Sequence, residues 1–115
     1  MPKFSITVPS RPGTNAPADF RIDHDQAVLD LMYTLSGLCG GATAIPAFGA
    51  WKDANGKLVT ENVTIVYTFG EEKTTSQIRG ICAHLCDELK QDCILLEVDG
   101  KHEFVEVVVV GATVF

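Results

Sequence analysis

Apolar and polar residues alternate at the start of the chain, where Phe4, Ile6 and Val8 are separated by polar side chains. A period of two predicts a β-strand, which Pro9 ends. The following residues, 10–20, are rich in Pro, Gly, Asn and Ala, a composition typical of irregular structure. We therefore expect a strand followed by a long loop, which is either a flexible connection or a cover over a site.

Two later segments carry apolar residues three or four positions apart, the spacing of one face of an α-helix. The first follows Asp23 or Asp25, either of which can cap it, and ends at the glycines that begin with Gly37. The second follows Thr74 or Thr75. The apolar stripes comprise Val28, Leu31, Met32, Leu35 and Leu38 in the first helix and Ile78, Ile81, Cys82, Leu85 and Leu89 in the second. Each helix therefore has one face for a core.

A long hairpin is predicted between the two helices. Asn55-Gly56 supplies the positive-φ residues that a tight turn needs. The flanking residues alternate or are β-branched, which predicts strands over about 43–52 and 58–69.

The register of this hairpin places two side chains of chemical interest together. With a three-residue turn at 54–56, Trp51 faces Val59 and Glu61 faces Gly49. Glu61 then shares a sheet face with Trp51, although most of that face is apolar. A carboxylate in such a place must be paired with a hydrogen-bond donor, be hydrated, or take part in ligand binding or catalysis.

The C-terminal residues predict a second, shorter hairpin. Cys93–Val98 reads as a fourth strand, Asp99-Gly100 as a tight turn and Phe104–Val110 as a fifth strand rich in valine. The whole order predicts an α+β protein with a ferredoxin-like β-α-β-β-α-β arrangement and an additional C-terminal strand. In that arrangement an antiparallel sheet carries both helices on one face.

The composition limits the classes of partner. A chain of 115 residues with 46% hydrophobic content suits a single domain over 1–115. The net charge of −6 and the scattered basic residues argue against a nucleic-acid partner, whose phosphates need clustered Lys and Arg. No segment approaches the roughly 20 apolar residues of a membrane span, and Met1–Val8 lacks the apolar core of a signal peptide. We therefore expect a cytoplasmic protein without a membrane partner.

The four cysteines are interpreted as buried structural thiols. Cys39, Cys82, Cys86 and Cys93 all lie in apolar segments, and no Cys-x-x-Cys pair is present. His84 lies two residues from Cys82 and from Cys86, on a different side of the helix. The sequence therefore predicts no metal site and no cofactor.

The hairpin supplies the candidate site. We expect Trp51 to be a stacking wall and Glu61 an acceptor or a general base whose pKa is raised by burial, while Gly49 leaves space beside the carboxylate. Tyr67, on the same face, is a further candidate ligand-binding residue, although it also suits a core or interface. The alternative is a structural Glu61 that accepts a hydrogen bond from Trp51 or a loop amide.

Other acids and bases are weaker candidates. His24 is expected in a surface cluster at the helix start, and His102 in a turn. Glu97 and Glu106 fall on the fourth and fifth strands, which the intervening turn would pair, so they could form an acid/base couple.

The predicted sheet has apolar residues on both faces. In the last strand both alternating sets are apolar, and Ala44, Phe48 and Val66 add to the face opposite Val63, Ile65 and Tyr67. An exposed apolar surface usually marks a protein interface. We expect a homo-oligomer, most simply a dimer; alternatively, the C-terminal strand covers a bare region of its own chain.

The run from Gly41 to Glu61 carries a motif, Gly49-x-Trp51-x-Asp53-x-Asn55-Gly56-Lys57 followed by Glu61. It resembles small uncharacterised bacterial and phage proteins with a Gly-x-Trp-x-Asp-x-x-Gly-Lys/Arg hairpin that closes on a glutamate. Lys90–Leu95, with its glutamine before the strand, is similar too, whereas Ala42 and Ala44 depart from the pattern. The resemblance implies a ferredoxin-like fold and a shared role for the glycine, tryptophan and glutamate, but it implies no reaction.

Three functional hypotheses follow. The first is a small cytosolic, oligomeric module without obvious chemistry that binds a small molecule near the 43–68 hairpin. The second is a small dimeric α+β-barrel enzyme in which Glu61, with His24 or His102, moves a proton. The third is an interaction or inhibitor module that uses its apolar sheet and acidic rim. The chain carries no complete catalytic, metal or nucleotide signature that would choose among them.

Overall fold

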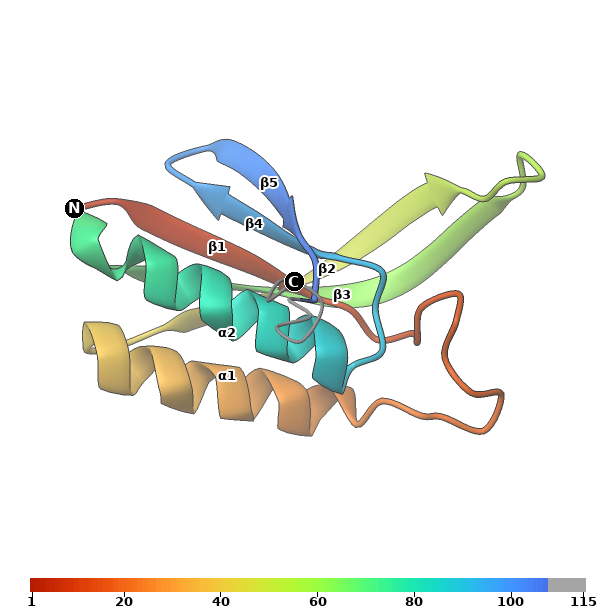
Figure 1. The fold of residues 1–115 in the computed structure, drawn as a ribbon, viewed down its shortest axis with the longest axis horizontal. Helices are drawn as coiled ribbons and strands as arrows, with labels where there is room; N and C mark the ends of the chain where they lie inside the picture. The colour runs from red at the N-terminus through yellow and green to blue at the C-terminus, as the bar shows by residue number, and fades with distance from the viewer. Residues whose placement is uncertain (108–115) are drawn as a thin grey trace, which may run out of the picture.

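The alternating N-terminal residues form the central strand of a five-stranded antiparallel sheet (Figure 1). The computed structural model describes residues 1–107. Its elements are β1 (Lys3–Val8), α1 (His24–Cys39), β2 (Thr43–Lys52), β3 (Leu58–Phe69), a 3₁₀ turn η1 (Glu72–Thr74), α2 (Thr75–Glu88), β4 (Ile94–Val98) and β5 (Lys101–Val105). The strands lie in the order β2-β3-β1-β4-β5. The predicted α+β class and the predicted order of elements are therefore confirmed.

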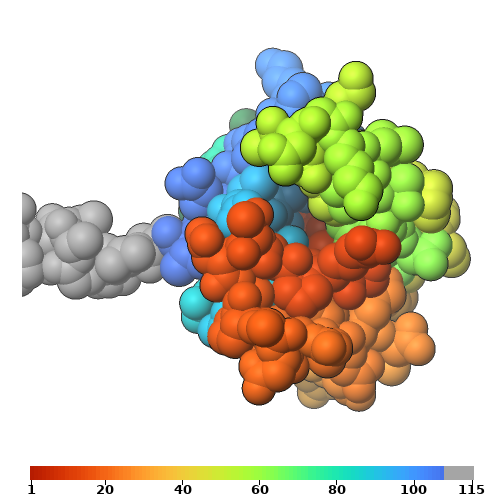
Figure 2. Space-filling model, turned by 90° about the vertical axis from the view of Figure 1, so that its right-hand side faces the viewer, coloured from red at the N-terminus to blue at the C-terminus, as the bar shows by residue number. Residues whose placement is uncertain are grey.

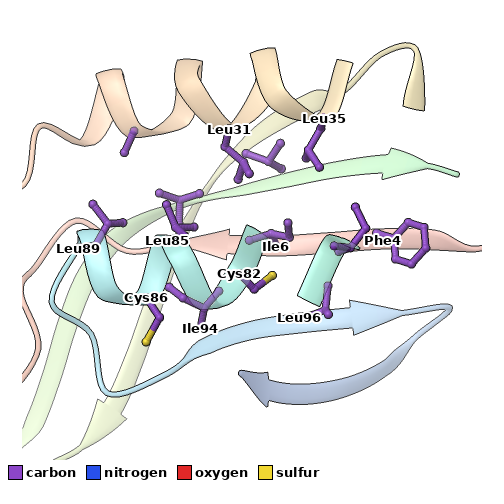
Figure 3. Packing of buried hydrophobic residues seen from close by; sticks show 14 residues of the cluster. Phe4, Ile6, Leu31, Leu35, Cys82, Leu85, Cys86, Leu89, Ile94 and Leu96 are labelled. Atoms are coloured by element: carbon purple, nitrogen blue, oxygen red, sulfur yellow. The ribbon is translucent and has the colours of Figure 1, made fainter. Parts of the chain in front are cut away.

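One face of the sheet packs against both helices and forms the core (Figure 3). The register places Ile6 beside Val66 on one side and Leu96 on the other, and all three side chains are fully buried. The helices cover them with the predicted apolar stripes, of which Leu31, Leu35, Ile78, Cys82 and Leu85 are buried. Alternate residues of the same strands point to the other face, which neither α1 nor α2 covers and which is called the open face below.

The predicted cap is present at the start of α1 but not at the start of α2. Asp23 caps α1 by accepting a hydrogen bond from the backbone N–H of Gln26 at 3.2 Å, and Gly40 ends the helix with φ 94°. Thr74 precedes α2 but makes no side-chain cap, because its hydroxyl donates to the carbonyl of Glu71 at 2.6 Å. The predicted threonine cap is therefore wrong, and the turn η1 begins this helical segment instead.

The last hairpin begins earlier than predicted. Asp99 and Gly100 have φ of 52° and 82°, as a tight turn of this kind requires. β5 therefore starts directly at Lys101 and ends at Val105, so the predicted strand at 104–110 is shifted, and residues 108–110 lie outside the described residues. His102 lies in this strand rather than in a turn, and it faces Glu97. Glu106 follows the strand, so the predicted carboxylate couple is not formed.

The four cysteines are free thiols, and Cys82 and Cys86 are fully buried on the core side of α2. Burial is the main cause that raises the pKa of Cys82 to about 12, with the charge of Glu103 adding to it. Within residues 1–107, no three side chains of metal-binding type are grouped to hold an ion, and no helix is both long and apolar enough to cross a membrane.

Candidate functional site

The hairpin register places Glu61 and Trp51 on one face of the sheet, as predicted, and the structure shows that this is the open face. Gly49 pairs with Glu61, and Trp51 pairs with Val59. The turn is closed by the Asp53 N–H, which donates to the Lys57 carbonyl at 2.9 Å. Glu61 and Trp51 are both odd-numbered residues of an aligned antiparallel pair, so their side chains leave the sheet on the same side.

Glu61 is buried, with 9% of its surface exposed, and one of its oxygens is anchored. Oε2 accepts the backbone N–H groups of Ser10 at 3.0 Å and Arg11 at 2.9 Å, and the Ser10 hydroxyl at 3.3 Å. Within residues 1–107 Oε1 accepts no hydrogen bond, and no side-chain oxygen or nitrogen there is fully buried without a partner. Oε1 is therefore accessible, while Oε2 fixes the carboxylate in place.

The donors to Glu61 belong to a strap, defined here as residues 10–14, which Pro9 directs away from β1. Its far end is tied to the turn before β4: the Gly13 N–H donates to the Lys90 carbonyl at 2.8 Å, and the Thr14 hydroxyl to Asp92 at 3.1 Å. A Cβ at Gly13 would lie 2.5 Å from the Lys90 oxygen. This close approach requires glycine.

A cavity of about 370 Å³ lies between the strap, the hairpin and β4. Figure 2 views the side of the molecule where these three segments meet. The lining residues come from β1, the strap, the hairpin, the turn before β4 and the last two strands, and they include Thr7, Arg11, Trp51, Glu61, Val63, Gln91, Asp92, Leu95 and Phe104. Most of the wall is apolar, and its charged side chains are one arginine and two carboxylates.

The candidate residues divide between the cavity and its surroundings. Trp51 and Glu61 line the cavity, and Trp51 keeps 45% of its surface exposed, so its ring is available to a ligand. Gly49 is not a lining residue; a Cβ there would meet only Val63, at an ordinary 3.8 Å. Tyr67 lies in a separate hollow, where the Lys3 ammonium sits 4.4 Å from the centre of its ring.

His24 was expected in a surface cluster at the helix start, and this prediction is wrong. Its Nδ1 lies 2.9 Å from the Pro9 carbonyl oxygen and its Nε2 lies 2.8 Å from the Thr64 hydroxyl. A carbonyl oxygen only accepts, so Nδ1 carries the proton. His24 thus ties the start of α1 to the end of β1, next to the strap, and lies outside the cavity.

Sequence reasoning missed the strap residues that complete the site. Gln91 donates from Nε2 to the Arg11 carbonyl at 2.7 Å, which links the strap to the turn before β4. Such contacts join residues 80 positions apart, and no local pattern announces them. The available signals were the proline-rich loop, read as a possible cover, and the glutamine before the fourth strand.

The chemistry of the cavity suits a ligand that is both aromatic and positively charged. An indole face can stack on a flat ring system and attract a cation, and a nearby carboxylate adds charge attraction. The cavity also holds the half-buried Cys93, and burial raises the pKa of its thiol. A thiol of raised pKa stays protonated and is a poor nucleophile, so Glu61 carries the chemical interest here.

Comparison with known proteins gives a fold likeness. The fold is similar to that of a phage SAM lyase. The structure of that lyase in complex with S-methyl-5'-thioadenosine has a TM-score of 0.67 and 18% sequence identity, over 92% of this chain and 89% of the lyase chain. Its apo structure has a TM-score of 0.59 and 18% identity, over 93% and 82%. The sequence matches no protein-family model and no curated protein.

This likeness corrects the first functional hypothesis. A small binding module without chemistry was expected, but both similar structures belong to an enzyme, and one of them holds a small nucleoside thioether. The sequence pointed away from catalysis because it contains none of the local signatures by which lyases or transferases of other folds are known. A site assembled from a strap, a hairpin and a strand end leaves no such signature.

Proposed function

We propose that this chain is an enzyme that cleaves S-adenosylmethionine (SAM) and releases S-methyl-5'-thioadenosine, with the cavity under the hairpin as its active site. Support comes from the fold likeness to the SAM lyase over nearly the whole chain. The observation that carries the proposal is the anchored carboxylate of Glu61 beside the exposed ring of Trp51 in one cavity.

The parts of SAM match the parts of the cavity. Adenine is a flat aromatic group that can stack on the Trp51 indole, an interaction typically worth about 1–3 kcal/mol. The sulfonium is a cation, which both Glu61 Oε1 and the indole face attract. A mostly apolar wall lowers the local dielectric and strengthens these attractions.

The proposed reaction balances without a second substrate. Release of S-methyl-5'-thioadenosine breaks the bond between sulfur and the aminobutyryl chain, and the electron pair stays on sulfur, which becomes neutral. The four-carbon fragment then completes its valence in one of two ways: its own carboxylate closes onto the carbon that leaves sulfur, or the adjacent carbon loses a proton to Glu61 Oε1. In both routes the carboxylate of Glu61 positions the sulfonium beside the indole ring of Trp51. The bond that breaks, between sulfur and the aminobutyryl chain, is thereby held in a fixed place.

The direct test is to incubate the purified protein with SAM and measure S-methyl-5'-thioadenosine by liquid chromatography and mass spectrometry. We expect the wild-type protein to form it and Glu61→Gln to lose activity by about 100-fold or more, because the amide neither pairs with the sulfonium nor accepts a proton. The matched control Glu72→Gln, on the exposed turn η1, should keep full activity. Absence of product from the wild-type protein, or full activity of Glu61→Gln, would refute the proposal.

Three further parts of the description are proposals as well. The strand order suits the ferredoxin-like arrangement expected from the sequence, with β5 added at one edge.

The exposed apolar side chains of Ile45, Trp51 and Phe104 support association of copies through the open face. Light scattering would measure the number of copies. Four free cysteines suit the reducing conditions of the cytoplasm.

A further inference from the structure

We propose that the guanidinium of Arg11 binds the carboxylate of the substrate's amino-acid chain, and so selects ligands that carry this chain. The inference rests on the proposed function, because it assigns one part of SAM to one wall of the same cavity. It adds a specificity residue that neither the sequence motif nor the fold likeness identifies.

The first observation is that the side chain of Arg11 is available. Arg11 is an exposed lining residue of the cavity, and within residues 1–107 its guanidinium makes no hydrogen bond or ion pair. The other two arginines are engaged: Arg21 donates to the carbonyls of Ala18 and Phe20, and Arg79 pairs with Glu103 at 2.6 Å. Arg11 is therefore the arginine whose donors remain open to a ligand.

The second observation is that the backbone of Arg11 is fixed on both sides. Its N–H donates to Glu61 Oε2 at 2.9 Å, and its carbonyl accepts from Gln91 Nε2 at 2.7 Å. The Cα that carries the Arg11 side chain is thus fixed beside Glu61. Fixing the backbone in the free protein lowers the entropy lost when the side chain meets a ligand.

The third observation is the charge pattern of the cavity wall. Its charged side chains are Arg11, Glu61 and Asp92. A ligand carboxylate is repelled by the two acids and attracted only by the arginine. The planar guanidinium also matches a carboxylate with two parallel hydrogen bonds, which gives orientation as well as affinity. The carboxylate end of SAM therefore belongs at Arg11, and its sulfonium at Glu61.

The test uses two ligands that differ in the amino-acid chain, measured by isothermal titration calorimetry. S-methyl-5'-thioadenosine lacks the chain, and S-adenosylhomocysteine carries it without a sulfonium. We expect Arg11→Gln to weaken S-adenosylhomocysteine about 10- to 100-fold, as for loss of a charge-assisted pair, and to leave S-methyl-5'-thioadenosine within about 2-fold. Arg11→Lys should recover part of the affinity, because it keeps the charge but loses the paired geometry.

Two controls separate this inference from the proposed function. Lys52→Gln removes an exposed cation outside the cavity wall and should leave both affinities unchanged. Each glutamine variant keeps its backbone N–H, so the hydrogen bond from residue 11 to Glu61 survives. If the wild-type protein binds neither ligand, the proposed function fails. If it binds both, and Arg11→Gln weakens both equally or neither, the role of Arg11 is refuted while the function stands.

Discussion

The two faces of the sheet carry different properties on the same strands. In β4 the neighbours Leu95 and Leu96 show the contrast: Leu96 is fully buried under the helices, whereas Leu95 lines the cavity on the open face. In β3 the same alternation buries Val66 in the core and turns Glu61 to the cavity. A period of two thus separates the residues that hold the fold from those that meet a ligand.

The faces also differ in what closes them. Two helices close the core face, whereas the strap, the long hairpin and the turn before β4 enclose the cavity on the open face. Substitutions on the core face should therefore change stability, and substitutions on the open face should change binding. The strap is the exception, because it contacts Glu61 at one end and the turn before β4 at the other.

The largest expected effect concerns the pair in β4. Leu96→Ala should lower the free energy of unfolding by about 2–5 kcal/mol, because it removes a fully buried side chain and leaves a space. Leu95→Ala, which changes the same atoms on the open face, should cost about 1 kcal/mol or less. Urea unfolding measures the free energy of unfolding of both variants. Equal losses of stability in the two would contradict the distinction between the core face and the open face.

The next effect is a loss of binding without a loss of stability. Trp51→Ala should weaken S-methyl-5'-thioadenosine about 10- to 100-fold, because it removes the stacking wall. Phe48→Ala is the matched control, since Phe48 is an exposed aromatic of the same strand on the opposite face and should leave binding unchanged. Calorimetry with both variants decides the point; equal affinities for the two would place the ligand elsewhere.

A change in the strap should affect both properties. Gly13→Ala forces a Cβ against the Lys90 carbonyl and should lower stability by about 1–3 kcal/mol, with weaker ligand binding because the strap shifts. Gly37→Ala, in α1 with open space around it, should instead raise stability by about 0.5–1 kcal/mol. A Gly13→Ala protein with wild-type stability and binding would show that the strap is not held as described.

The smallest effect is a pH dependence that belongs to the core face. The pKa of Cys82 is raised to about 12 from its ordinary 9.0, so above pH 9 the unfolded state loses this proton before the folded state does. Below pH 9 both states keep this proton and the contribution is complete; between pH 9 and 12 it is lost progressively, and the loss is about 1.4 kcal/mol at pH 10. Cys82→Ala should show a shallower loss over this window in urea unfolding, and identical slopes would contradict the assignment.

The sequence predicted the parts of the fold that depend on neighbours in the chain. The hairpin strands, the pairing of Gly49 with Glu61 and the two helices follow from local turn and spacing rules. The start of β5 was predicted too late because the valine run outweighed the turn rule, although Asp99-Gly100 forces the return strand to begin at Lys101.

The site was less predictable because its contacts are distant in sequence. Trp51 and Glu61 were identified from register, but the donors that anchor Glu61 come from residues about 50 positions away. His24 read as a surface residue, since nothing local indicates that it reaches Pro9 and Thr64. The hypothesis of a binding module without chemistry was wrong for the same reason, although an enzyme was the second hypothesis. The resemblance of the hairpin motif to small phage proteins stays a prediction.

The most direct test of the separation between the faces is an NMR titration of the ¹⁵N-labelled protein with S-methyl-5'-thioadenosine. We predict saturable shifts at the amides of Ser10 and Arg11, the indole N–H of Trp51 and the residues around Glu61, with the outer surfaces of α1 and α2 unchanged. Shifts confined to the helices, or no shift at millimolar ligand, would contradict the assignment of the open face as the ligand-binding and catalytic face.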